Sequence, residues 1–100
     1  MSGGRDPRSD PVLAGTRERI GELDRAILDA VNARVELVTR LRRHKAENGY
    51  PFVDPAREEQ LIRQLVAANP GPLSAAAVEE LFRAIVEIGK REAARLDRAE

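Results

Sequence analysis

The sequence contains no cysteine and no tryptophan, and only 3% of its 100 residues are aromatic. The lack of cysteine excludes a disulfide framework and a thiolate metal site. A core made of Leu, Ile, Val and Ala, almost without aromatics, suits helices better than a sandwich or barrel. Seventeen basic and seventeen acidic residues leave no net charge, so no strong field favours nucleic acid or anionic lipid. Without a signal-like or membrane-length apolar run, we expect one cytoplasmic domain with no membrane partner.

Proline is also absent from a long stretch of the chain. Residues 1–11 mix Gly, Pro, Ser and charge without periodicity, and we predict a disordered N-terminal tail there. The helical domain is expected over 12–98. From residue 12 to residue 48 there is no proline, and apolar residues recur at helical spacing: Ile20, Leu23, Ile27, Val31, Val38 and Leu41. This pattern predicts one helix of roughly 35 residues, about 50 Å long.

Two shorter helices follow in the predicted fold. The segment Asn-Gly-Tyr-Pro at 48–51 ends the first helix, and Asp54 caps a second helix with Pro55 at its first position. The second Pro- and Gly-rich segment, 69–72, separates it from a third helix that Ser74 caps and that continues to about residue 97. The apolar face of the second helix is formed by Leu61, Ile62, Leu65 and Val66. That of the third is formed by Val78, Leu81, Phe82, Ile85, Gly89 and Leu96.

The first helix is too long for a compact monomer. A 100-residue globule has a radius of gyration near 13 Å, so a helix of about 50 Å leaves part of its apolar stripe without a partner. An all-α homodimer, in which two long helices intertwine and share a core, solves this most economically.

Two cations interrupt the apolar stripe of the first helix. Arg34 and Lys45 are 11 residues apart, so they face the same way about 16 Å apart along the axis. Because an unpaired cation on an apolar face is costly, each needs a counter-charge, either from Glu58 or Asp54 or from a bound carboxylate. The two side chains could converge on a small anionic ligand. The alternative is that they reach solvent or form ordinary ion pairs.

These charged positions carry a family resemblance. The segment from residue 16 to residue 65 resembles the all-helical, type II class of chorismate mutases, and the likeness extends over about 12–97. The family pattern places an Arg before Ile-x-x-Leu-Asp, then an Arg, a Lys and a final Asp-x-x-Arg-Glu at fixed spacing. Without a gap, this sequence matches it with Arg17, Ile20, Leu23, Asp24, Arg34, Lys45, Asp54, Arg57 and Glu58.

The resemblance implies rearrangement of chorismate to prephenate in phenylalanine and tyrosine biosynthesis. This pericyclic shift needs no nucleophile, metal or other cofactor. The enzyme holds the reactive conformer and stabilises negative charge that grows on the ether oxygen. By the resemblance, Arg34 grips a carboxylate and Lys45 donates to the ether oxygen.

The resemblance also assigns the remaining positions. Glu58 accepts from the ring hydroxyl, and Asp54 offers its backbone N–H near that group. Arg57 is either a substrate contact or a solvated helix-start residue. Arg17 lies about 25 Å before Arg34 along the helix, which is too far for the same site, and in this family the equivalent Arg enters from the other subunit.

The third helix departs from the family pattern Ser-x-x-x-Gln. Gly89 takes the Ser position and Ala93 the Gln position, so one hydrogen-bond donor to the ether oxygen is missing. Glu92, one residue away on the apolar stripe, is a candidate replacement, provided that it points inward and that burial keeps its carboxyl protonated. The alternative is a solvated Glu92 near the end of the helix.

Other functions are compatible with the same fold. The chain could act as an isochorismate pyruvate-lyase, as a mutase of 4-amino-4-deoxychorismate, or as a non-enzymatic helical regulatory module. Another shikimate-pathway enzyme could assist a weak site. The basic run at 40–45 lacks interleaved aromatics, which argues against nucleic-acid binding.

Overall fold

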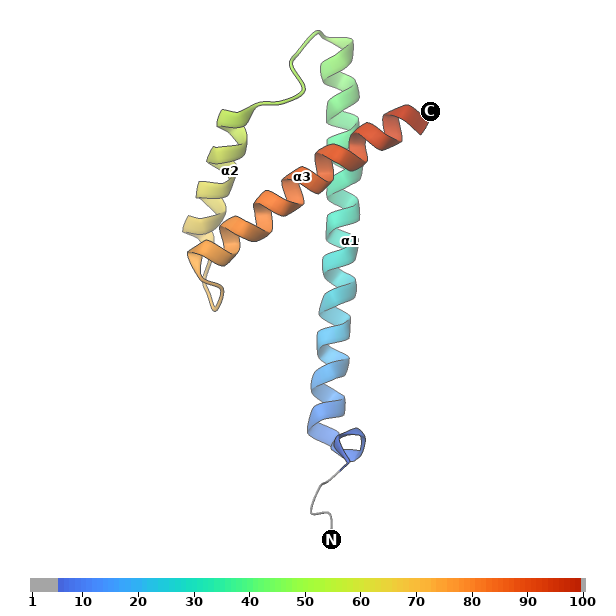
Figure 1. Ribbon diagram of the computed structural model, residues 1–100, viewed down its shortest axis with the longest axis vertical. Coiled ribbons are helices and arrows are strands. Elements are labelled where there is room, and N and C mark those ends of the chain that lie inside the picture. Colours follow the sequence, from blue (N-terminus) through green and yellow to red (C-terminus); the bar gives the residue numbers. More distant parts are fainter. Residues whose placement is uncertain (1–5, 100) are drawn as a thin grey trace. The chain divides into compact units, whose positions relative to one another are not determined.

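The computed structural model describes residues 6–99 and contains three α-helices and one 3₁₀ turn in that range (Figure 1). The helices are α1 (Pro11–Glu47), α2 (Pro55–Ala68) and α3 (Ala75–Ala99), and no strand is present among the described residues. The prediction of an all-α chain with a long first helix is therefore confirmed. The chain divides into two compact units, residues 1–32 and 33–100, and the boundary falls within α1.

Residues 6–11 are more regular than the predicted disordered tail. Pro7–Ser9 form a 3₁₀ turn (η1) capped by Asp6. The carboxylate of Asp10 then accepts a 2.8 Å hydrogen bond from the N–H of Val12, and Pro11 is the first residue of α1. This is an N-cap followed by proline, a common start for a helix. Residues 1–5 of the predicted tail lie outside the described residues.

The C-terminal end of α1 follows from a glycine. Gly49 has a φ of 70°, a left-handed conformation that glycine adopts without steric cost. The N–H of Tyr50 then bonds back to the carbonyl of Lys45 at 2.9 Å. This closure is typical of helix ends with glycine just after the last turn, and it directs the chain toward α2.

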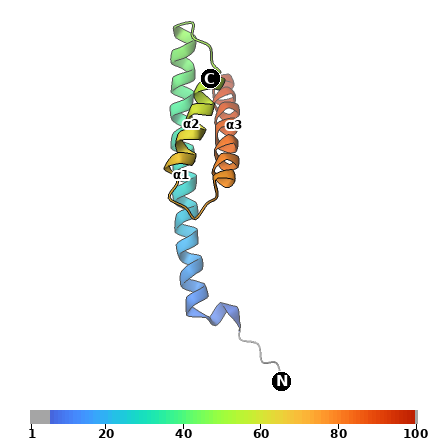
Figure 2. The same ribbon diagram turned by 90° about the vertical axis from the view of Figure 1, so that its left-hand side faces the viewer.

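The two shorter helices begin at the predicted caps. The Asp54 side chain accepts from the backbone N–H of Arg57 at 3.1 Å, and Pro55 opens α2. The hydroxyl of Ser74 accepts from the N–H of Ala77 at 3.1 Å at the start of α3. Helices α2 and α3 pack side by side in the second unit (Figures 1 and 2), and Arg83 on α3 pairs with Glu59 on α2 at 2.7 Å.

The core of the described chain is small. The buried apolar side chains are Ile62, Val78, Val86 and Ala93, and the buried polar residue is Thr39, whose hydroxyl donates to the carbonyl of Val35. Leu81, predicted to lie on the inward face of α3, is 45% exposed, whereas Val86, which was not predicted to lie on that face, is buried. The helical pattern locates an apolar stripe but does not fix which edge of that stripe meets the neighbouring helix.

Apolar residues of α1 remain largely exposed. Ile20, Leu23, Ile27 and Leu28 in the first unit, and Leu37 and Leu41 in the second, are each more than half exposed. Among residues 6–99, no helix combines the length and the apolar character that a membrane crossing requires.

Candidate active site

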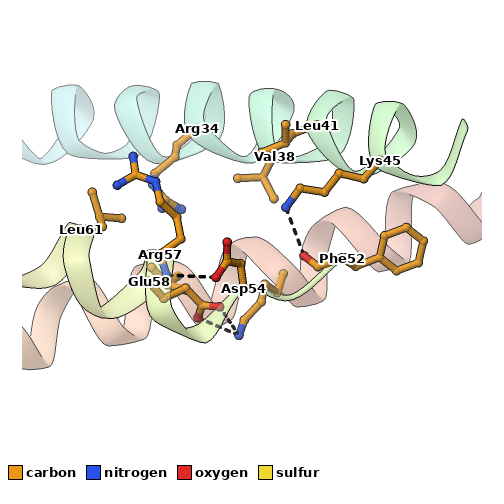
Figure 3. A pocket seen from close by; sticks show the side chains of 11 residues that line it. Arg34, Val38, Leu41, Lys45, Phe52, Asp54, Arg57, Glu58 and Leu61 are labelled. Carbon is orange, nitrogen blue, oxygen red and sulfur yellow. Dashed lines mark hydrogen bonds and ion pairs between the residues drawn. The ribbon is translucent and has the colours of Figure 1, made fainter. Parts of the chain in front are cut away.

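Most of the sequence-predicted site residues meet around one pocket within the second unit. The cavity measures about 230 Å³ and is bounded by α1, by the segment joining α1 to α2, and by α2 and α3 (Figure 3). Its charged lining consists of Arg34, Lys45, Asp54, Arg57, Glu58 and Lys90, and its apolar lining of Val38, Leu41, Phe52, Leu61 and Val86. Four cationic and two carboxylate side chains give the lining a net charge of +2.

Arg34 and Lys45 extend from α1 toward the start of α2 (Figure 3). Within residues 6–99, the guanidinium of Arg34 makes no hydrogen bond or ion pair. The ammonium of Lys45 has one long contact, at 3.5 Å from the carbonyl oxygen of Phe52. Neither cation therefore has a carboxylate partner in the described chain.

The two carboxylates of the pocket are engaged elsewhere. The Asp54 side chain caps α2 through the N–H of Arg57. The Glu58 carboxylate pairs with Lys90 on α3, with Nζ 3.0 Å from Oε1. Neither acid therefore pairs with Arg34 or Lys45, and both cations are partly exposed.

Arg57 lies beside Arg34 in the pocket lining (Figure 3). Its Nη1 has one long side-chain contact, 3.5 Å from Oε1 of Gln60. Arg57 thus adds a third cation, placed at the start of α2, where the helix dipole also favours negative charge.

Lys90 is a pocket residue that the sequence interpretation missed. Glu87 and Glu58 both hydrogen-bond its ammonium and raise its pKa. The i,i+3 spacing of Glu87 and Lys90 on one helix was visible in the sequence. The pairing with Glu58 joins residues 32 positions apart and needs the packing of α2 on α3 to become apparent.

Gly89 does not line the pocket, but its Cα lies close to the guanidinium of Arg34. A methyl group built on its Cα would come within 3.2 Å of Nη1 of Arg34. The buried glycine therefore gives the guanidinium room to pass against α3.

Of the two alternatives for Glu92, the structure favours the solvated one. Its carboxylate pairs with Arg95 at 3.0 Å, and this hydrogen bond lowers the pKa of Glu92 instead of raising it. Glu92 is not among the residues that line the pocket. A partly exposed carboxylate held by a neighbouring guanidinium favours the ionised form, which argues against a protonated donor at this position. Ala93 is only 1% exposed and also lies outside the lining.

Arg17 belongs to the first unit and is not part of the lining. No group of three or more His, Asp or Glu side chains within residues 6–99 is arranged to hold a metal ion. Phe52, which the sequence interpretation also missed, carries the guanidinium of Arg42 over its ring at 4.6 Å.

Comparison with known proteins agrees with this geometry. Residues 16–94 match the family described as chorismate mutase type II. A solved structure of chorismate mutase (Form II) from Thermus thermophilus is 31% identical, with a TM-score of 0.80 over 83% of this chain and 94% of that one. Form I from the same organism is 32% identical, with a TM-score of 0.76 over 77% of this chain and 96% of that one. No curated protein matches the sequence.

Proposed function

The chain belongs to the chorismate mutase type II family, and from the geometry of its pocket we propose how it converts chorismate to prephenate. The substrate is a ring dianion with an enolpyruvyl ether. The reaction is intramolecular: the ether C–O bond breaks while a C–C bond forms. The protein therefore contributes by holding the two ends of the forming bond together and by placing positive charge where negative charge develops.

The observation that carries this proposal is the pair of cations without carboxylate partners. Arg34 and Lys45 face one cavity, while Asp54 and Glu58 are committed to a helix cap and to Lys90. A net lining charge of +2 complements a dianion. Binding of the substrate would supply the counter-charge that these cations lack.

Roles for the lining residues follow from their donors. The planar guanidinium of Arg34 suits two parallel hydrogen bonds to one carboxylate. Lys45, held only by its long contact with Phe52, has N–H groups to offer to the ether oxygen. Arg57 adds charge at the start of α2, the backbone N–H of Asp54 lies near the ring hydroxyl, and the Glu58 carboxylate accepts from that hydroxyl.

The proposed assembly is an intertwined homodimer in which Arg17 of each chain completes the site of the other. The exposed apolar residues of α1 support this, because a second copy would cover them. The spacing of 17 residues, about 25 Å on one helix, also argues against Arg17 and Arg34 serving the same site in one chain.

The proposal also covers the cellular location, the pathway and a partner of the enzyme. We place it in the cytoplasm, in phenylalanine and tyrosine biosynthesis. Because Ala93 supplies no donor to the ether oxygen, a second enzyme of the shikimate pathway could compensate by binding and tightening the site.

Mixing the purified protein with chorismate tests the activity. The expected result is loss of chorismate absorbance with prephenate as the product. Release of pyruvate from isochorismate, with chorismate untouched, would instead make the chain a lyase. No turnover of chorismate, isochorismate or the 4-amino analogue would favour a regulatory module.

A further inference from the structure

Lys90 pairs with one carboxylate in the pocket lining and with one exposed carboxylate on α3. It lies one residue after the buried Gly89, and its side chain lines the same cavity as Arg34 and Lys45. Its Nζ lies 3.0 Å and 3.5 Å from the two carboxylate oxygens of Glu58 and 2.8 Å from Oε1 of Glu87. The Lys90 and Glu58 side chains are 32% and 26% exposed, whereas Glu87 is 65% exposed, so the pair with Glu58 is the more sheltered one.

The contact with both oxygens fixes the direction of the Glu58 carboxylate. Glu58 lies in the first turn of α2, and Lys90 approaches it from α3, so the interaction ties together two helices across the pocket. A carboxylate offers about four lone-pair positions, so Lys90 leaves Glu58 able to accept another hydrogen bond. A neutral hydroxyl can use that remaining capacity.

An ammonium group at the same place would meet a different environment. Two donors that share one carboxylate lie within roughly 6 Å of each other, since each hydrogen bond spans about 3 Å. Lys90 balances part of the negative charge of Glu58, and it shares its own charge with the more exposed Glu87. A second cation there would therefore be repelled by Lys90 without having Glu58 to itself.

We infer that Lys90 is a positioning residue for Glu58 and that it makes the pocket select a neutral hydroxyl over an ammonium group on the substrate ring. This inference rests on the proposed function, because it assumes that Glu58 faces the ring substituent of chorismate. It would allow a site that keeps an acid at this position to discriminate against the 4-amino analogue. Specificity here would come from a repulsive charge as much as from an attractive contact.

The test compares kcat/KM for chorismate and for 4-amino-4-deoxychorismate at about pH 6.5, where an alkyl amine is protonated. Wild-type protein should prefer chorismate. Lys90→Gln and Lys90→Met should lower the chorismate-to-amine ratio by at least about threefold, the effect of two like charges about 6 Å apart even in bulk water. Lys90→Arg keeps the charge and should keep the ratio. Glu87→Gln, which removes the exposed partner of Lys90, is the matched control and should stay within about twofold of wild type.

The possible results distinguish a failure of the proposed role of Lys90 from a failure of the proposed mutase activity. A wild-type enzyme that uses the amine as well as chorismate would overturn it without any variant. Equal losses on both substrates in Lys90→Gln and Lys90→Met, with an unchanged ratio, would mean that Lys90 serves only to hold the fold. If the wild-type protein does not turn over chorismate at all, the proposed function fails first and the inference fails with it.

Discussion

Lys45 uses its ammonium group for a single long contact with the carbonyl of Phe52, 3.5 Å away. A lysine in that position keeps its charge available for a ligand, unlike Lys90, which is held by two carboxylates. The two lysines of this chain thus line one pocket with different hydrogen-bond partners. In the proposed mechanism Lys45 faces the reacting bond, and Lys90 positions the acceptor Glu58.

Removing the charge of Lys45 should mainly affect the chemical step. We expect Lys45→Met, which keeps the apolar stem, to lower kcat by at least about 10²-fold, the usual cost of losing one donor to a developing oxyanion. Steady-state kinetics with circular dichroism would check this. His44→Ala, on the exposed neighbouring residue, is the control. Activity of Lys45→Met within a few-fold of wild type would remove Lys45 from the mechanism.

Glu92 should have no influence on the pH dependence of the rate. Its pKa is lowered from 4.5 by the hydrogen bond from Arg95, so the carboxyl is ionised throughout the neutral range. The stability that this pair adds is present above the unfolded pKa and is lost only as pH falls through the lower, folded pKa. We expect Glu92→Gln to leave the profile of kcat between about pH 5.5 and 8.5 unchanged. A profile that rises toward acid in wild type and flattens in Glu92→Gln would restore the protonated donor.

Residues that act through local spacing could be predicted, and those that act across the fold could not. The spacing of charged residues along the sequence selects five positions that all line one cavity: Arg34, Lys45, Asp54, Arg57 and Glu58. The link from Glu58 to Lys90 was missed because it depends on how α3 packs against α2. For Glu92 the sequence left two alternatives open, although the i,i+3 spacing to Arg95 already favoured the solvated one.

At the scale of the helices, termini were the most predictable features. The backbone groups at a helix end find hydrogen-bond partners only a few residues away, so the sequence signal is contained in a short segment. This holds at Asp54 with Pro55, at Ser74 and at Gly49. The start of α1 has the same kind of signal in Asp10 and Pro11, which was hidden within a polar segment. Which side of α3 is buried was less predictable, because the exposed fractions of Leu81 and Val86 depend on where the neighbouring helix contacts the apolar stripe.

Asp54 both caps α2 and lines the pocket, and two substitutions test its contribution as a cap. Asp54→Ala removes the cap of α2 and should lower the free energy of unfolding by about 1 kcal/mol. Asp54→Asn can still accept from the N–H of Arg57, so it should keep most of that stability. Urea unfolding of both variants would measure this. Equal stability of Asp54→Ala and wild type would show that the cap contributes nothing.

At the scale of the whole molecule, the described chain buries little apolar surface. Its four buried apolar side chains contrast with large hydrophobic residues left exposed along α1. Small domains bury a low fraction of their surface and depend on added constraints such as oligomerisation. A second copy of the chain is the constraint that the proposed function also requires.

Sedimentation should therefore show a dimer under all conditions in which the protein is folded. Ile27, which is 60% exposed on α1, is a suitable site for disruption. Ile27→Asp would place a charge in the shared core and should either unfold the protein or convert it to an inactive monomer. The control Arg40→Gln alters an exposed position on the same helix and should stay dimeric. A wild-type monomer that is folded and active would contradict the proposed assembly.

Mixing two inactive variants tests the central claim, a dianion site completed by residues of two chains. Arg17→Ala and Arg34→Ala should each be nearly inactive alone. Co-expressed in equal amounts, they should recover about a quarter of the wild-type activity, because half of the dimers are mixed and each of those has one intact site. No recovery in verified mixed dimers, or full activity of Arg17→Ala alone, would contradict the shared site.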